Sequence, residues 1–128
     1  MRITKQYFLS FNNTSSTTAY INIPFKVASI HVKAIGLDSG NIPAAGSASY
    51  VSLVSDLTDY QPLGITFNDS TYYSATFQDI NLDLNTPRYI NGTFTFTLYG
   101  VDGLPYTPTG GGLDRIILIL EFNDNVTY

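Results

Sequence analysis

The segment Thr93–Tyr99, with the sequence TFTFTLY, decides the fold class of this chain. Phe94, Phe96 and Leu98 occupy every second position, and a period of two is typical of a strand with one buried face. Threonine, phenylalanine and tyrosine are also residues that favour strands. The segment therefore predicts an amphipathic β-strand with the two phenylalanines and the leucine on its core side.

The same period recurs outward along the chain, between clusters of turn residues. Pro24 and Thr86–Pro87 are expected to interrupt strands, because proline has no backbone N–H to donate. Asn91–Gly92 indicates either a tight turn or a bulge inside a longer strand. The other expected strands are Ile3–Phe11, Thr18–Ile23, Phe25–Ile35, Ser47–Leu57, Leu63–Phe67, Thr71–Phe77, Asp79–Leu84 and Leu113–Phe122.

Two of these segments allow the buried face to be assigned. On the first strand, Ile3, Tyr7, Leu9 and Phe11 share one face. On the segment 25–35, alternation places Ala28, Ile30, Val32 and Ala34 inward and Ser29, His31 and Lys33 outward.

These strands predict an all-β fold: a two-sheet antiparallel sandwich of the jelly-roll or Greek-key type, with about eight strands. The 128 residues leave room for one core, and we expect a single domain spanning 1–128. No internal repeat or linker divides the chain. There is no cysteine, so the domain depends on its core and not on disulfides.

Charge is sparse and unevenly placed. Charged residues make up 12% of the chain, which leaves few charges to keep a lone domain soluble and favours assembly with partners. Between Ala34 and Pro87 there is no Lys or Arg, and every charged residue is an aspartate. Such a segment repels phosphates, so we expect no nucleic-acid partner. An acidic rim in solvent and an acidic docking patch are both compatible with it.

The chain lacks the side chains that most enzymes need. His31 is its one histidine and lies in the middle of an expected strand, without the loop that a catalytic triad requires. The glycines at 110–112 are not followed by the Lys and Ser/Thr of a phosphate-binding loop. We therefore expect a protein that is not an enzyme and holds no cofactor or metal. Calcium in the loops around Asp38, Asp56 or Asp59 is the alternative left open.

The last expected strand, Leu113–Phe122, is apolar on both faces. Ile116, Leu118, Leu120 and Phe122 form one row, while Ile117 and Ile119 belong to the other. A half-exposed strand alternates apolar with polar residues, so the second row must be covered by the protein's own loops or by a neighbouring subunit. Leaving both isoleucines exposed would forgo about 3 to 6 kcal/mol of burial. We favour the subunit, which makes Ile117 and Ile119 interface candidates.

Tyrosines supply the other interface candidates: Tyr72, Tyr99 and Tyr106. An exposed tyrosine suits protein interfaces, where its ring supplies contact area and its hydroxyl tolerates water. It suits stacking against sugars equally well, so these residues do not distinguish the two kinds of ligand.

No targeting signal is expected. The apolar core of the N-terminus runs only over residues 7–9, too short for a signal peptide, and the longest apolar run, Ile116–Leu120, is too short to span a membrane.

Short strands rich in Thr, Phe and Tyr, long polar or Pro/Gly loops, and the lack of cysteine and catalytic residues together resemble the small single jelly-roll virion proteins of DNA viruses. The resemblance extends over residues 3–122. It implies a minor capsid, cement or vertex protein, located in the virion, that forms homo-oligomers or binds a major coat protein without a cofactor. The alternative is a receptor- or carbohydrate-binding β-sandwich such as a fibre head, which exposed aromatic residues clustered with Asp and Asn would favour.

Overall fold

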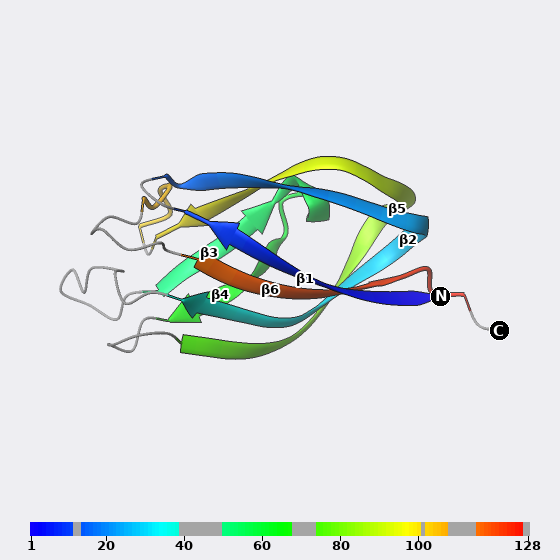
Figure 1. Cartoon of the computed structure of the whole chain (residues 1–128), viewed down its shortest axis with the longest axis horizontal. Coiled ribbons are helices and arrows are strands. Elements are labelled where there is room, and N and C mark those ends of the chain that lie inside the picture. The colour runs from blue at the N-terminus through cyan, green and yellow to red at the C-terminus, as the bar shows by residue number, and fades with distance from the viewer. Residues whose placement is uncertain (12–13, 39–49, 68–73, 101, 108–114, 127–128) are drawn as a thin grey trace.

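The computed structural model describes residues 1–11, 14–38, 50–67, 74–100, 102–107 and 115–126. Six strands form one antiparallel sheet in the order β1-β6-β2-β5-β3-β4, and the sheet curls into a half-barrel (Figure 1). The prediction of an all-β chain is confirmed. The elements are β1 (Arg2–Ser10), β2 (Ser16–Asp38), β3 (Tyr50–Ser55), the 3-10 turn η1 (Asp56–Thr58), β4 (Pro62–Phe67), β5 (Ser74–Tyr99) and β6 (Arg115–Asn123).

Two very long strands organise the sheet. β2 has 23 residues and β5 has 26, and they pair with each other from Ser16 with Thr97 to Leu37 with Ser74. The second part of β2 also pairs with β6, which in turn pairs with β1. The last part of β5 pairs with β3, which pairs with β4. The β2–β5 ribbon therefore joins a region containing β1 and β6, termed the β6 half, to a region containing β3 and β4, termed the β3 half.

The ribbon is irregular where the two halves meet. The register of β2 against β5 shifts twice over residues 22–29. Pro24 lies in this stretch, and Pro87 lies on the facing part of β5, between the paired residues Asp83 and Arg88. Proline cannot donate a ladder hydrogen bond, and extra residues on one strand bend and twist a sheet. The two prolines therefore occupy the place where the ribbon turns around the core.

This bend changes the expected strand count. Strands were expected to end at Pro24 and at Thr86–Pro87, but β2 and β5 continue through both sites. Asn91 and Gly92 lie inside β5, with Asn91 paired to Asn22, so they form no turn. At the level of hydrogen bonding, the described residues form six strands in one sheet where about eight strands in two sheets were expected.

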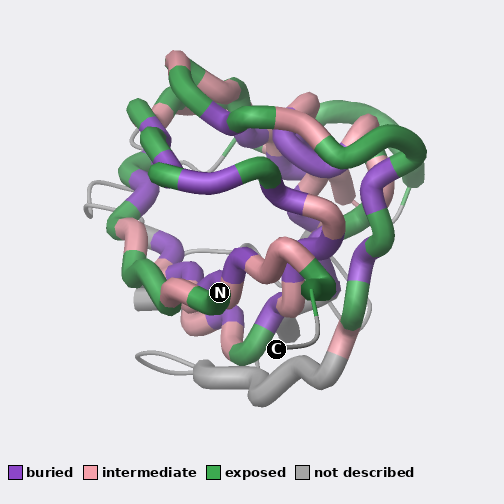
Figure 2. Tube along the Cα trace, turned by 90° about the vertical axis from the view of Figure 1, so that its right-hand side faces the viewer, coloured by how far each residue is buried: buried purple, intermediate pink, exposed green. Residues whose placement is uncertain are grey.

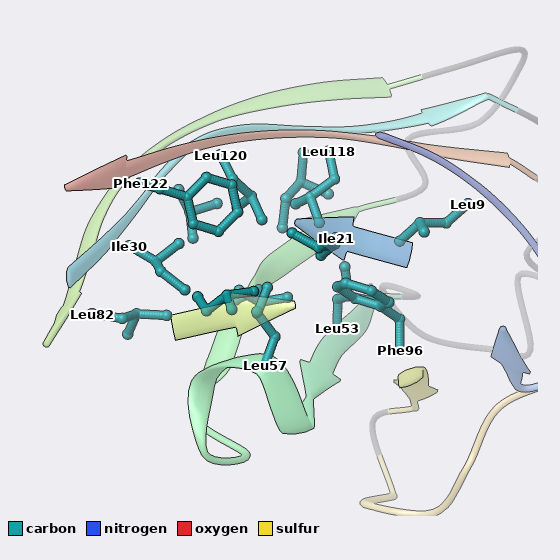
Figure 3. Packing of buried hydrophobic residues seen from close by; sticks show 14 of the residues in the cluster. Leu9, Ile21, Ile30, Leu53, Leu57, Leu82, Phe96, Leu118, Leu120 and Phe122 are labelled. Carbon is teal, nitrogen blue, oxygen red and sulfur yellow. The ribbon is translucent and has the colours of Figure 1, made fainter. Parts of the chain in front are cut away.

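One hydrophobic cluster draws residues from all six strands and from η1. Buried and exposed positions alternate along the strands (Figure 2). Side chains from the two halves of the sheet face each other across this core (Figure 3). They include Leu118, Leu120 and Phe122 from the β6 half and Leu53, Leu57 and Phe96 from the β3 half, all at most 1% exposed.

The expected inward row of β1 is confirmed: Leu9 and Phe11 are buried, and Ile3 and Tyr7 pack against the core. β1 and β4 form the two edges of the sheet. Lys5 pairs with the buried Leu120, so alternation along β1 assigns it to the same side as Tyr7 and Leu9. Its side chain is nevertheless exposed.

The faces assigned to 25–35 are partly wrong. Ile30 and Val32 are buried as expected, but the register shifts between Val32 and Ala34. This irregularity moves Ala34 out of the core row and places Ile35 in it, fully buried. Ser29, expected to face outward, is buried as well, and its hydroxyl donates a hydrogen bond of 3.0 Å to Asn125 Oδ1.

The position of Tyr7 on the core side of β1 predicts a loss of stability at alkaline pH. Burial raises the pKa of the Tyr7 phenol from 10.0 to about 12. Because the folded pKa lies above the unfolded one, the neutral phenol stabilises the fold fully below about pH 10, and this contribution is lost as the pH rises through about 12.

Tyr7→Phe cannot ionise, so its free energy of unfolding in urea should fall less than that of the wild type between about pH 9 and about pH 12. The other nine tyrosines are common to both proteins and cancel in the comparison. Parallel pH profiles would show that Tyr7 titrates like a solvent-exposed phenol.

Candidate interaction surfaces

The two isoleucines predicted as interface residues lie on the outer side of β6. β6 is paired on both edges, with β1 and with β2. Its core-side row, Ile116, Leu118, Leu120 and Phe122, is fully buried. Ile117 and Ile119 alternate with this row and are partly buried. The strand is therefore covered on one side by the core, and its other side belongs to the outer surface of the sheet.

The register surrounds these isoleucines with further apolar residues. Ile117 pairs with Phe8 on one side and with Gly36 on the other, and Ile119 pairs with Ala34. Phe8 is 62% exposed. Directly opposite residues project from the same side of a sheet and shield one another, which explains why the isoleucines are only partly exposed. These five residues are termed the apolar face.

Polar residues border the apolar face. Gln6 is the β1 partner of Ile119, and the next pair on that side joins Thr4 to Glu121. Lys33 Nζ forms an ion pair of 3.0 Å with Glu121 Oε2. Such surface pairs contribute little stability, so this one defines the boundary of the face more than it holds the fold. An apolar centre with a polar rim is the usual anatomy of a protein interface.

The outer side of the β3 half has a different chemistry. Tyr20 and Tyr89 are 64% and 71% exposed. Tyr20 pairs with Thr93, and Asn22 pairs with Asn91, so these side chains and Tyr89 project from one side. Tyr20 Oη donates a hydrogen bond of 2.6 Å to Asn91 Oδ1. These five residues are termed the tyrosine face.

Apart from the two faces, a cluster of polar side chains holds η1 against β5. Arg88 Nη1 donates to Asp59 Oδ1 at 2.8 Å, and Nη2 donates to the carbonyl oxygen of Leu57 at 2.6 Å. Asp56 Oδ1 accepts from the backbone N–H of Thr95 at 2.9 Å. Ser55 Oγ caps the turn by accepting from Leu57 N at 3.0 Å.

The carboxylates of this cluster were the candidates for calcium. Asp56 Oδ1 and Asp59 Oδ1 accept the hydrogen bonds that fix η1, whereas Asp59 Oδ2 is buried without a hydrogen-bond partner among the residues that the structure describes. The side chain of Asp38 lies outside the described residues. Within the described part of the chain, no three His, Cys, Asp or Glu residues gather closely enough to hold a metal ion.

The remaining predicted residues are dispersed. Tyr99 is partly buried at the end of β5, where it pairs with Ser52. Tyr106 packs against the core, and its N–H donates to Leu98 O at 2.8 Å. Tyr72 lies outside the described residues. His31 is partly buried in β2. In the described ranges, no helix has the length and apolarity to cross a membrane.

Sequence reasoning missed Phe8, Tyr20 and Tyr89, the large hydrophobic residues of the two faces that are mainly exposed. The alternation of the strands carried the signal: Phe8 lies between the core residues Tyr7 and Leu9, and Tyr20 between Ala19 and Ile21. Tyr89 likewise directly precedes the buried Ile90. A large apolar or aromatic residue that is out of phase with the core row marks an exposed position.

Comparisons with known proteins yield no family. No protein-family model matches the chain, and no curated protein matches it. Among solved structures, the chain is similar to dimeric latent PorU from Porphyromonas gingivalis, with a TM-score of 0.46 and 10% sequence identity. The match covers 94% of this chain and 12% of the PorU chain.

The Arg88 contacts predict a stability effect. Arg88→Ala removes two charge-assisted hydrogen bonds and leaves the Leu57 carbonyl and the Asp59 carboxylate without this donor. We expect the free energy of unfolding in urea to fall by about 2 kcal/mol.

Lys33→Ala is the matched control, because Lys33 bonds a single carboxylate and its side chain is 45% exposed against 34% for Arg88; its loss should cost less than about 1 kcal/mol. Equal costs for the two variants would contradict a structural role for Arg88.

Proposed function

We propose that this chain is a non-enzymatic structural protein of a virus particle, and that it acts through protein–protein contacts made by the apolar face. The observation that supports the proposal is Phe8, 62% exposed and paired with Ile117 on the outer side of the sheet. A sheet side that meets water normally carries polar residues at such positions. Adjacent apolar residues on an outer side mark an interaction site.

The energy available from covering this face is substantial. Complete burial of a Phe or Ile side chain is worth about 1.5 to 3 kcal/mol relative to full exposure. Phe8 is mainly exposed, so a partner that covers it would recover most of this burial free energy. Ile117 and Ile119 are already partly buried, so covering them would recover less. Together the three side chains offer a partner several kcal/mol before the cost of association.

The partner proposed for this face is a second copy of the chain. β1 and β6 pair over nine residues, and four strands at ordinary spacing give the β6 half an outer side of about 19 by about 30 Å. That is about 600 Å² for the apolar face together with its polar border, of the same order as the roughly 800 Å² per partner of a standard interface. A two-fold dimer places the same patch on both partners, and an uncharged apolar centre meets its own copy without repulsion.

The topology supports a jelly-roll fold for the sheet. Six strands, with β2 and β5 each divided at the bend, give eight segments in chain order. The β6 half then contains segments 1-8-3-6, and the β3 half contains segments 2-7-4-5. This is the strand order of the double-sheet jelly roll that virus capsid proteins use. The proposal therefore places the chain among the small jelly-roll proteins that assemble into or onto a virion.

Assembly through the apolar face predicts a measurable mass. Light scattering after size exclusion should give at least twice 14.1 kDa for the wild type. Phe8→Asp and Ile117→Asp should each return the mass to that of one chain with an unchanged β-type circular dichroism spectrum, because a buried unpaired charge is costly at an interface.

Leu104→Asp is the matched control, since Leu104 is also 62% exposed but lies outside the apolar face. Its mass should equal that of the wild type. A wild-type chain that stays monomeric at high concentration contradicts self-assembly, and a monomer that binds a coat protein assigns the face to that partner instead.

A further inference from the structure

We propose that the tyrosine face binds a neutral oligosaccharide chain, a binding function separate from assembly through the apolar face. The geometry that points to it is the hydrogen bond of 2.6 Å from Tyr20 Oη to Asn91 Oδ1, made by a tyrosine that remains 64% exposed.

This hydrogen bond fixes the orientation of the Tyr20 ring. Tyr20 pairs directly with Thr93, so Asn91 is its diagonal neighbour on the adjacent strand. Side chains of a strand normally stand roughly perpendicular to the sheet. An upright tyrosine would carry its hydroxyl above the reach of the short Asn91 carboxamide. The ring of Tyr20 must therefore lean along the sheet towards Asn91, while most of its surface stays open to solvent.

An exposed aromatic ring beside amide groups is suited to a sugar. The C–H groups of a pyranose pack on an aromatic face, while its hydroxyls at the edge need donors and acceptors. The hydrogen bond to Tyr20 uses Asn91 Oδ1 and leaves the amide N–H groups of Asn91 as donors. Asn22, opposite Asn91, is also exposed and carries a second carboxamide, and the exposed Thr93 has a hydroxyl. The ring is thus placed among groups that can bind the rim of one sugar.

A second ring sets the length of the ligand. Tyr89 is 71% exposed and lies on the same side of β5 as Asn91. Thr93, the backbone partner of Tyr20, is four residues from Tyr89, or about 13 Å along an extended strand. The Tyr20 ring leans towards Asn91 and so towards Tyr89, which makes the two rings closer than their backbone positions. A ligand that contacts both rings still has to extend along the strand from one ring to the other, which favours a chain of sugars over a monosaccharide.

The charge of the face favours a neutral ligand. The five residues of the tyrosine face are uncharged, and a single cation, Lys26, lies at the position paired with Tyr89. Arg88, the neighbour of Tyr89, is turned away to Asp59 and Leu57. Binding of a nucleic acid needs several cations along the phosphates, which this face does not offer. Its aromatic and polar side chains match uncharged sugars instead.

The test is a titration of the full-length 15N-labelled chain, followed by NMR, with cellohexaose, mannohexaose and chitohexaose as probes. At least one probe should shift the backbone amides of Tyr20, Asn22, Tyr89 and Asn91. Tyr20→Ala should weaken that binding about tenfold or more, since it removes an aromatic stacking partner. Tyr20→Phe keeps a ring but loses the hydrogen bond that orients it, and its loss should be smaller.

Tyr60→Ala is the control for a general effect of exposed tyrosines, because Tyr60 is 72% exposed and lies outside the face. It should bind the probe as the wild type does. The proposal is overturned if none of the three probes binds, if the shifts map elsewhere, or if Tyr20→Ala binds as well as the wild type. Shifts of the tyrosine-face amides on raising the protein concentration alone would assign the face to self-association and also overturn it.

Phe8→Asp separates this proposal from that of assembly. The variant should be monomeric and should bind the oligosaccharide with unchanged affinity, because Phe8 belongs to β1 and the tyrosine face to β2 and β5. Failure of assembly therefore leaves the sugar result intact, and failure of sugar binding leaves the mass measurement intact.

Discussion

The bend of the β2–β5 ribbon is the constraint on which the rest of the structure depends. A flat ribbon of this length would hold the two halves of the sheet side by side, with the apolar side of each facing water. Proline on both strands interrupts the ladder at residues 22–29, so the ribbon turns there and the two apolar sides face each other. The single core exists because this turn brings Phe122 of one half opposite Leu57 of the other.

The bend also determines what the outer surface presents. Once the two apolar sides enclose the core, the outer sides point away from each other, and their compositions differ. One side carries Phe8 beside Ile117, and the other carries Tyr20 beside Asn91. Arg88 follows the irregular stretch of β5 immediately and ties η1 to it, so the corner of the sheet is held by charge-assisted hydrogen bonds as well as by packing. Two separate contacts on opposite sides are thus compatible with one small domain.

Local alternation carried most of what the sequence could predict. The core row Ile116, Leu118, Leu120 and Phe122 and the burial of Phe96 and Leu98 follow from a period of two, which any strand obeys whatever its partner. The pairing of Phe8 with Ile117 could not be predicted, because register between distant strands depends on the whole fold. The irregularity before Ala34 reversed an inward assignment for the same reason: a bulge changes the phase of a strand without a mark in its composition.

The two edge strands of the sheet are built to resist aggregation when the protein is concentrated. β4 begins with a proline. On the other edge strand, β1, the charged Lys5 occupies a position on the side of the strand that faces the core. Both devices hinder the addition of a foreign strand, which is how sheets grow into fibrils. The same devices leave the faces of the sheet, and not its edges, open to neighbouring molecules. A high local concentration of the chain then carries little danger of amyloid-like aggregation.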